Sequence, residues 1–139
     1  MRRTAREIAF MLIYEEQFNK NRDVEFSFNF LKTEQEILKN GSLEKDDEDY
    51  IDNILEKYIC NKIEIEKILN ENIYDYEPDR IYKVDRALLY LAIVEILYIK
   101  TSPAIVINEI IEIAKVYSTD KSAQFINGIL GSIIKNYCN

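Results

Sequence analysis

The sequence predicts an all-α protein of about seven helices, in two small packed bundles around one central apolar helix. Two observations predict this class. Only three Gly and two Pro occur in 139 residues, so long segments run without the residues that break helices. Along most of the chain, apolar residues recur three and four positions apart, which is the spacing of one buried helix face. We expect a single domain, 1–139, with an N-terminal sub-bundle over about 1–61 and a C-terminal sub-bundle over about 62–139.

The first helix is predicted to start at Thr4, which can cap its N-terminus together with Glu7 three residues later. It extends to about Asn19, where a polar run breaks the apolar pattern. A second helix is predicted over Val24 to Lys39, because apolar residues return there at helical spacing. Asn40-Gly41 would end it, since Gly readily adopts the left-handed conformation of a helix C-terminus.

A third helix begins in the acidic run Ser42 to Asp49, whose carboxylates suit the positive end of the helix dipole. It continues to about Ile59, and the phase of the apolar pattern changes at Asn61-Lys62. A shorter fourth helix then extends to about Ile73. The stretch Tyr74 to Lys83 contains a proline within a charged run and is the most loop-like part of the chain.

The predicted centre of the fold is Ile81 to Ile99 (IYKVDRALLYLAIVEILYI). From Val84 onward, apolar residues fall on every side of a helix, a pattern found in core helices and in membrane spans. Asp85, Arg86 and Glu95 interrupt the run, which leaves fewer than the roughly 18 apolar residues that a bilayer requires. We therefore expect a sheathed helix in a soluble protein, with these residues almost fully buried: Leu88, Leu91, Ala92, Ile93 and Ile96.

Two more helices complete the predicted fold. Ala104 to Tyr117 (AIVINEIIEIAKVY) is rich in β-branched residues, which are also typical of strands. We predict a helix, because four of its apolar residues keep helical spacing: Ile107, Ile110, Ile111 and Ala114. The last helix is predicted over Lys121 to Tyr137.

The composition excludes several kinds of chemistry. The sequence contains no His, which removes the usual general base, the commonest zinc ligand and every His-containing triad. Its three glycines form no phosphate-binding motif. Cys60 and Cys138 lie far apart without CxxC spacing, so we expect reduced thiols in a cytosolic protein. The N-terminal segment carries Glu7, Glu15 and Glu16 within its apolar pattern and is not expected to be a signal peptide. We therefore expect that the protein is not an enzyme and binds neither a cofactor nor a metal.

Four stretches, in this order along the chain, resemble the NusB family of transcription antitermination factors: RRTAREIAFMLIYE (Arg2 to Glu15), VDRALLYLAIVEIL (Val84 to Leu97), INEIIEIAK (Ile107 to Lys115) and QFINGIL (Gln124 to Leu130). The residues between about 24 and 82 match in helical character only. The resemblance implies an all-α, cytoplasmic, non-enzymatic RNA-binding factor. Its partners would be the small-subunit ribosomal protein NusE, the boxA element of nascent ribosomal RNA leaders, and the RNA polymerase antitermination complex.

Three arginines, Arg2, Arg3 and Arg6, lie at the start of the first helix. The planar guanidinium can donate two parallel hydrogen bonds to a phosphate. Cations at a helix N-terminus oppose the helix dipole, so these residues are poorly placed for stability alone. We expect all three to bind RNA; the alternative is that they are solvated terminal charges. Arg6 is also one of two candidate partners for Glu95, which must be paired if it is buried. The other candidate is the N-terminus of the Ala104 to Tyr117 helix.

The resemblance places Asp85 and Arg86 at the surface that the partner protein and the RNA share. The alternative is a helix-start acid followed by an outward-pointing base. Tyr90 stands where the family commonly has Arg. A phosphate contact is therefore either missing or replaced by a base stacked on the Tyr90 ring.

The resemblance also places the start of the last helix beside the RNA, with Lys121 as a phosphate ligand and Phe125 available to contact a base. The sequence alone favours a core position for Phe125, and Tyr14 is similarly divided between the core and the RNA surface. Gly128 and Gly131 are interpreted as packing positions, because small residues let another helix approach closely.

We therefore expect a factor that binds boxA RNA together with NusE. The net charge of −7 argues against strong RNA binding by this chain alone, because such affinity comes from neutralising phosphates. A basic partner would supply the missing charge. One alternative is a helical assembly factor that binds proteins only. Another is the helical part of an RNA cytosine methyltransferase, for which the sequence lacks a Gly-rich nucleotide-binding segment. Homo-oligomerisation is left open, and no membrane association is expected.

Overall fold

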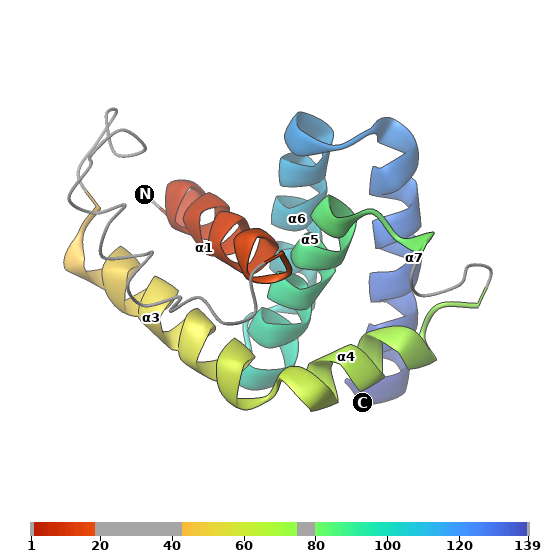
Figure 1. Ribbon diagram of the computed structural model, residues 1–139, viewed down its shortest axis with the longest axis horizontal. Coiled ribbons are helices and arrows are strands. Elements are labelled where there is room, and N and C mark those ends of the chain that lie inside the picture. Colours follow the sequence, from red (N-terminus) through yellow and green to blue (C-terminus); the bar gives the residue numbers. More distant parts are fainter. Residues whose placement is uncertain (1, 19–42, 75–79, 139) are drawn as a thin grey trace.

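The computed structural model describes residues 2–18, 43–74 and 80–138 (Figure 1). These residues form six α-helices and one π-helical segment: α1 (Arg2–Glu16), α3 (Lys45–Cys60), α4 (Lys62–Glu71), α5 (Lys83–Ile93), η2 (Val94–Ile99), α6 (Pro103–Tyr117) and α7 (Asp120–Tyr137). No strand occurs in this part of the chain, so the all-α prediction is confirmed, including the helix over 104–117. The helix predicted over Val24 to Lys39 lies outside the described residues.

Helix α5 lies in the middle of the molecule and contacts each of the other five α-helices of the described part (Figure 1). On one side of it, α1 packs against α3. On the other side, α6 and α7 pack together as an antiparallel pair. Helix α4 follows α3 after a break at Asn61 and reaches α7 at the far edge. The boundary between two sub-bundles near 61 and 62 stays a prediction.

The central helix is sheathed on all sides, as its sequence predicts. Leu88, Leu91, Ala92 and Ile93 are 0% exposed and Ile96 is 3% exposed. Together with the inward faces of α1, α3, α6 and α7 they form one continuous core. Removing this apolar surface from water, at roughly 25 cal/mol per Å², is the main term that holds the helices together.

The central helix is not α-helical to its end. From Val94 to Ile99 it widens into the π-helical segment η2, and Lys100 ends it in the left-handed conformation, with φ at 69°. The backbone N–H of Thr101 donates to the Glu95 carbonyl oxygen at 2.9 Å, which closes the helix end. Single π-helical turns are uncommon within helices and frequently lie at functional positions. Here the widened turn contains the buried side chain of Glu95.

Two predictions about helix details are wrong. Helix α1 begins at Arg2, so Thr4 lies within its first turn and cannot cap it with Glu7. Gly128 and Gly131 lie on the exposed side of α7, where an added Cβ would meet no atom of the described structure within 4 Å. They are therefore not packing positions within this chain.

Helix α7 is positioned at both ends by side-chain hydrogen bonds. At its start, the Thr119 hydroxyl accepts from the backbone N–H of Ser122 at 2.9 Å, an N-cap interaction. Near its end, the buried amide oxygen of Asn72 accepts from the Ser132 hydroxyl at 2.8 Å and from the Asn136 amide at 3.0 Å. The first interaction fixes the start of α7, and the second holds its later turns against the end of α4.

Candidate nucleic-acid interface

The three arginines of α1 each contact a carboxylate from a different part of the fold. Arg2 pairs with Asp47 of α3 at 3.3 Å, and its guanidinium lies 4.4 Å from the centroid of the Tyr50 ring. Arg3 pairs with a glutamate of α6, and Arg6 with one of η2. The arginine motif therefore attaches α1 to three neighbouring elements and is not a free cationic arm.

The pair between Arg6 and Glu95 lies inside the protein. The Arg6 Nε donates to Glu95 Oε2 at 2.8 Å and its Nη2 donates to Oε1 at 3.0 Å. Arg6 is 5% exposed and Glu95 is 0% exposed. Burial alone would lower the pKa of Arg6, but the hydrogen bonds and charge of Glu95 raise it above its ordinary value. Of the two partners predicted for Glu95, Arg6 is the one observed. The RNA contact expected of Arg6 is replaced by a structural role, because its guanidinium faces inward.

Arg3 is more open but is also paired. Its Nε donates to Glu109 Oε1 at 3.3 Å, and its Nη2 donates to the other carboxylate oxygen. The hydrogen bond from Arg3 is the first cause of a pKa of Glu109 below the ordinary 4.5. Arg6 adds a longer contact to the same carboxylate, at 3.4 Å. A phosphate can use the Nε and Nη2 donors of Arg3 only in competition with Glu109.

Aromatic rings line one face of α1 towards the start of α5. Tyr14 is half-buried, and its ring centroid lies 6.3 Å from that of Phe10 and 4.9 Å from that of Phe18. Phe18 is 59% exposed, and the Lys83 ammonium lies 5.4 Å from its ring centroid. The Phe18 and Lys83 pair is suited to a stacked base beside a phosphate. The sequence interpretation missed both residues, although the four-residue spacing of the α1 aromatics was visible.

The start of α5 carries the predicted partner surface. Asp85 is 3% exposed, and its carboxylate accepts a hydrogen bond from the Ser118 hydroxyl at 2.8 Å. That bond joins the start of α5 to the turn between α6 and α7. Arg86 is half-buried beside it. Asp85 therefore serves the fold as a helix-start acid while it also lines the cleft described below.

Tyr90 does not lie on the surface. It is 3% exposed, its hydroxyl accepts from Arg86 Nη1 at 2.9 Å, and its ring centroid lies 5.8 Å from that of Tyr58. A base cannot stack on a ring that is covered on its faces by the core. The RNA contact expected of Tyr90 is therefore replaced by packing, with Arg86 held by the tyrosine hydroxyl.

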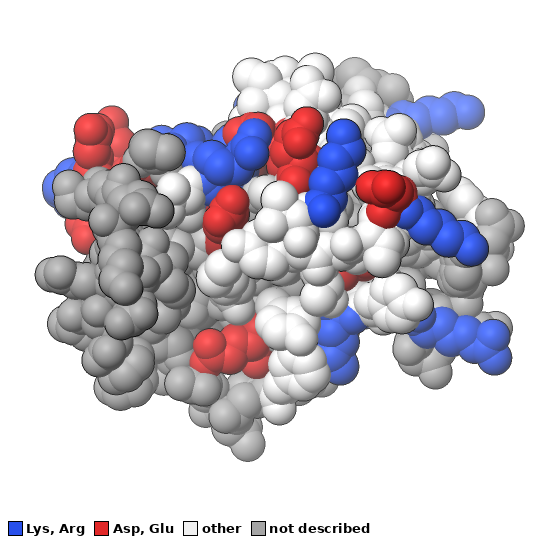
Figure 2. All heavy atoms as spheres, turned by 90° about the horizontal axis from the view of Figure 1, so that it is seen from above, with Lys and Arg blue, Asp and Glu red and all other residues white. Residues whose placement is uncertain are grey.

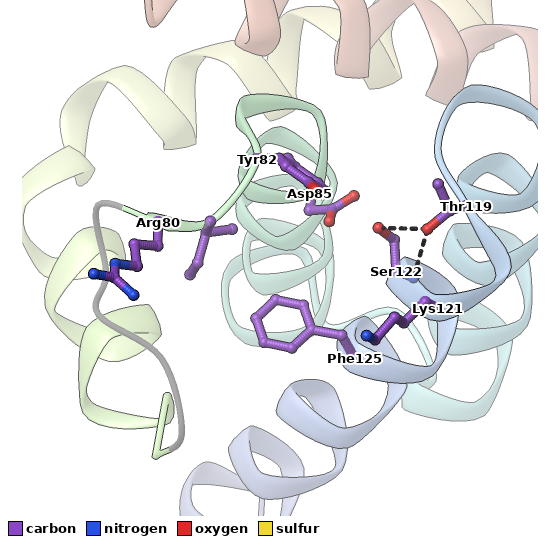
Figure 3. A pocket seen from close by; sticks show the side chains of 8 residues that line it. Arg80, Tyr82, Asp85, Thr119, Lys121, Ser122 and Phe125 are labelled. Carbon is purple, nitrogen blue, oxygen red and sulfur yellow. Dashed lines mark hydrogen bonds between the residues drawn. The ribbon is translucent and has the colours of Figure 1, made fainter.

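A cleft of about 460 Å³ lies between the start of α5 and the start of α7 (Figure 3). Two cations, Arg80 and Lys121, stand at opposite walls, and the half-buried ring of Phe125 lies between them. The Asp85 carboxylate faces the Thr119 and Ser122 hydroxyls across the upper part of the cleft (Figure 3). The structure thus brings Asp85, predicted from the start of the central helix, together with Lys121 and Phe125, predicted from the start of the last helix.

On one face of the molecule, charges of both signs are interspersed. Figure 2 shows cationic and acidic side chains alternating among the described residues of this face, without one continuous basic area on it. In the described part of the chain, no group of three or more metal-ligating side chains could hold a metal ion. No helix among the same residues is long and apolar enough to cross a membrane. Among the described residues, the cleft is lined from the starts of α5 and α7, and Phe18 beyond the end of α1 contacts Lys83 at the start of α5, so these three elements meet at one corner of the fold.

This fold is shared with known proteins. The chain belongs to the NusB family, whose model matches residues 3–135. It is 37% identical over 135 residues to the transcription antitermination protein NusB of Finegoldia magna, a match that covers 96% of this chain and 93% of that protein. It is 38% identical over 133 residues to the NusB protein of Listeria monocytogenes, a match that covers 95% of this chain and 94% of that protein.

Solved structures agree with the sequence relatives. A crystal structure of the antitermination factors NusB and NusE in complex with dsRNA contains a chain that superposes with a TM-score of 0.84 at 27% identity, over 98% of this chain and 97% of that chain. NusB of T. maritima superposes with a TM-score of 0.81 at 27% identity, over 100% of this chain and 94% of that chain.

Proposed function

We propose that this protein is a transcription antitermination factor that binds RNA jointly with a basic protein partner of the NusE type. Its RNA would be the boxA element of ribosomal RNA leader transcripts, bound within the RNA polymerase antitermination complex. The protein would work in the cytoplasm as an adaptor, without catalysis. Membership of the NusB family and the likeness to a NusB chain bound to NusE and dsRNA support this function.

The observation that carries the proposal is the cleft between the starts of α5 and α7. It gathers an acid for a basic partner, two cations for phosphates and an aromatic ring for a base, from two segments far apart in the sequence, 80–85 and 119–125. The resemblance to the family indicates three of these residues, Asp85, Lys121 and Phe125. RNA-binding proteins combine such features because phosphate contacts provide affinity while bases stack on aromatic rings.

The proposed RNA surface extends from this cleft along α1. It comprises the exposed guanidiniums of Arg2 and Arg3, the ring of Tyr14, and Lys121 and Phe125 in the cleft. Phe18 and Lys83 join these residues because they lie between α1 and the start of α5. Asp85 and Arg86 form the proposed partner surface. Asp85 is buried but lines the cleft. Arg6 and Tyr90 are left out, because the Arg6 guanidinium pairs with Glu95 inside the protein and the Tyr90 ring packs against Tyr58.

Charge explains why a partner is required. The chain carries −7, and the arginines of α1 already face carboxylates. Each neutralised phosphate releases counterions, so a surface whose cations are already paired gains little affinity from them. A basic partner bound at Asp85 would add cations next to the RNA, and the complex would then bind more tightly than either protein alone.

The test is a fluorescence anisotropy titration of labelled boxA RNA with this protein, with NusE and with both. We expect weak binding by this protein alone and much tighter binding by the pair, with a preference over a scrambled RNA of equal length. Equal affinity for boxA and scrambled RNA in the presence of both proteins would contradict the proposal.

One rival has an observation in its favour. The pairing of Arg2 and Arg3 with carboxylates suits a helical assembly factor that binds proteins only. Under that rival, this protein would still bind NusE, but it would add nothing to the affinity of NusE for boxA RNA. The same titration therefore separates the two functions.

A further inference from the structure

We infer that Glu109 lowers the affinity of the proposed RNA surface by occupying the Nε and Nη2 donors of Arg3, so that a phosphate makes a two-bond contact with these donors only by displacing the Glu109 carboxylate. This inference rests on the proposed function, since it concerns the strength of the same surface. In this role Glu109, a residue of α6, competes with RNA for Arg3 and binds neither the RNA nor the partner itself.

The geometry shows direct competition for the same donors. A guanidinium presents its N–H groups as a fork that matches the two oxygens of a carboxylate or a phosphate. In Arg3, the fork formed by Nε and Nη2 is directed at the two oxygens of Glu109. A phosphate that approaches Arg3 in the same forked geometry needs these donors. Its two-bond contact is therefore open only after Glu109 has moved away.

The surroundings single out Glu109 among the carboxylates that face the arginines. Glu95 is inside the core and pairs with the buried Arg6. Asp47, opposite Arg2, has a side chain only 8% exposed. The side chain of Glu109 is 24% exposed and that of Arg3 is 43% exposed. Arg3 can therefore turn away from Glu109 into water at low cost, while Glu109 keeps its longer contact with Arg6 at 3.4 Å. The contact between Arg3 and Glu109 is thus one that a ligand can open.

The pairing also changes the thermodynamics of phosphate binding. A free cation on a nucleic-acid-binding surface neutralises a phosphate and releases the counterion that had been condensed on the RNA. Arg3 already has a fixed counterion in Glu109, so forming its phosphate contact leaves a carboxylate beside the RNA. A single phosphate contact at Arg3 therefore adds little affinity. RNA binding then depends on several contacts formed together, including those that the partner protein makes.

The test uses a labelled oligouridylate, which offers phosphates without the boxA sequence, and compares two variants of equal charge. Glu109→Gln keeps the shape of the side chain and one acceptor oxygen, so the fold is retained, as circular dichroism would verify. Glu112→Gln is the matched control, because Glu112 lies one turn further along α6 and faces Lys115 at 4.0 Å. Glu112 acts on Arg3 through its charge only, whereas Glu109 also accepts hydrogen bonds from it. Both variants reduce the negative charge by one, so a difference between them reports the position and not the net charge.

We expect Glu109→Gln to bind oligouridylate roughly three- to sixfold more tightly than the wild type, from the loss of one carboxylate at contact distance in water. The slope of log affinity against log salt should steepen by up to about 0.7, which is one single-strand phosphate contact. Glu112→Gln should change both values much less. Adding Arg3→Gln to Glu109→Gln should cancel the gain.

Equal effects of Glu109→Gln and Glu112→Gln would overturn the inference, since net charge alone would then explain them. A gain that survives in the double variant with Arg3→Gln would also overturn it. Failure of the proposed function looks different: the wild-type protein with NusE would not prefer boxA RNA over a scrambled sequence. Because oligouridylate carries no boxA element, the two results can be read separately.

Discussion

The pair between Arg6 and Glu95 is the residue-level contact that most firmly attaches α1 to the core. Both side chains are almost fully buried and are joined by two hydrogen bonds. Taking such charges out of water is costly, and the cost is offset only while both partners are present. This contact explains why an arginine follows two exposed ones in the same motif and has a different role.

Replacing Arg6 by Ala should therefore lower the free energy of unfolding by about 3 to 5 kcal/mol, because it leaves Glu95 buried without its partner. Urea unfolding followed by circular dichroism measures this. Arg3→Ala is the matched control and should cost about 1 kcal/mol or less, since its pair is partly exposed. Similar costs for the two variants would show that Arg6 is no more a structural residue than Arg3.

The sequence predicted this contact only in part. Glu95 stands among Leu88, Leu91, Ala92 and Ile99, so its need for a partner was visible, and Arg6 was one of two candidates. The choice between Arg6 and a helix N-terminus depends on how α1 crosses η2, which is a tertiary property. The family commonly has an arginine at the position of Tyr90. That comparison does not show whether a tyrosine there packs into the core, because packing also depends on the tertiary structure.

At the scale of the element, α5 is the helix that the others cover. Leu91 is fully buried at its centre. Leu91→Ala should lower the free energy of unfolding by about 2 to 5 kcal/mol, because the smaller side chain buries less apolar surface and leaves a cavity. Ile63→Ala on α4, where the side chain is 87% exposed, should change it by about 0.5 kcal/mol or less. A small effect at Leu91 in the same urea titrations would contradict the central place of α5.

The contact between α1 and α6 should depend on pH. Arg3 lowers the pKa of Glu109 in the folded protein, so the folded state binds a proton less readily than the unfolded state. The stabilisation is complete above the ordinary value of 4.5 and is lost as the pH falls through the lowered folded value. Wild type should therefore exceed Glu109→Gln in unfolding free energy by up to about 1 kcal/mol at pH 7. By pH 3, thermal unfolding should show a smaller difference, and a constant difference would refute this account.

The starts of α1 and α5 should divide the work of binding. Replacing Arg2 and Arg3 by Ala should weaken the binding of RNA of any sequence. The slope of log affinity against log salt should flatten by up to about one unit for each phosphate that is no longer neutralised, and the affinity for NusE should stay nearly unchanged.

Asp85→Lys should weaken the affinity for NusE first, because it places a like charge against a basic partner. Asp85→Asn is its control for the hydrogen bond to Ser118, since the amide oxygen can still accept it. Anisotropy and calorimetry measure the two affinities, and normal RNA binding by the double arginine variant would show that the α1 start is not part of the site.

The positions of the helices could be predicted better than the details of their ends. The apolar period placed α5, α6 and α7 within a few residues, because a helix that buries one face must repeat that face every three or four positions. The π-helical end of the central helix was not predictable, since its apolar pattern continues through Val94 to Ile99 while the hydrogen bonding changes. The prediction that Thr4 caps the first helix is also wrong, because α1 begins at Arg2, before the first residue whose side chain could cap it.

At the scale of the whole molecule, the acidic net charge fits the proposed function, in which a basic partner supplies cations beside the RNA. The family resemblance and the all-α architecture were both available from the sequence, and the comparisons and the structure confirm them. The cleft was not available, because it forms only when the turn before α7 packs on the start of α5. The neutralisation of the arginines was likewise hidden, since their partners lie in α3, η2 and α6, far away in the sequence.

Amide hydrogen exchange tests most directly whether partner and RNA bind at the starts of α5 and α7. It would be measured for the protein alone, with NusE, and with NusE and boxA RNA. The first N–H groups of a helix have no partner within the helix and exchange quickly unless something covers them. We predict slower exchange at 83–85 and 120–121 when NusE and RNA bind, with no change along the outer face of α3 and α4. Protection of α3 and α4 with unchanged exchange at the starts of α5 and α7 would contradict the account.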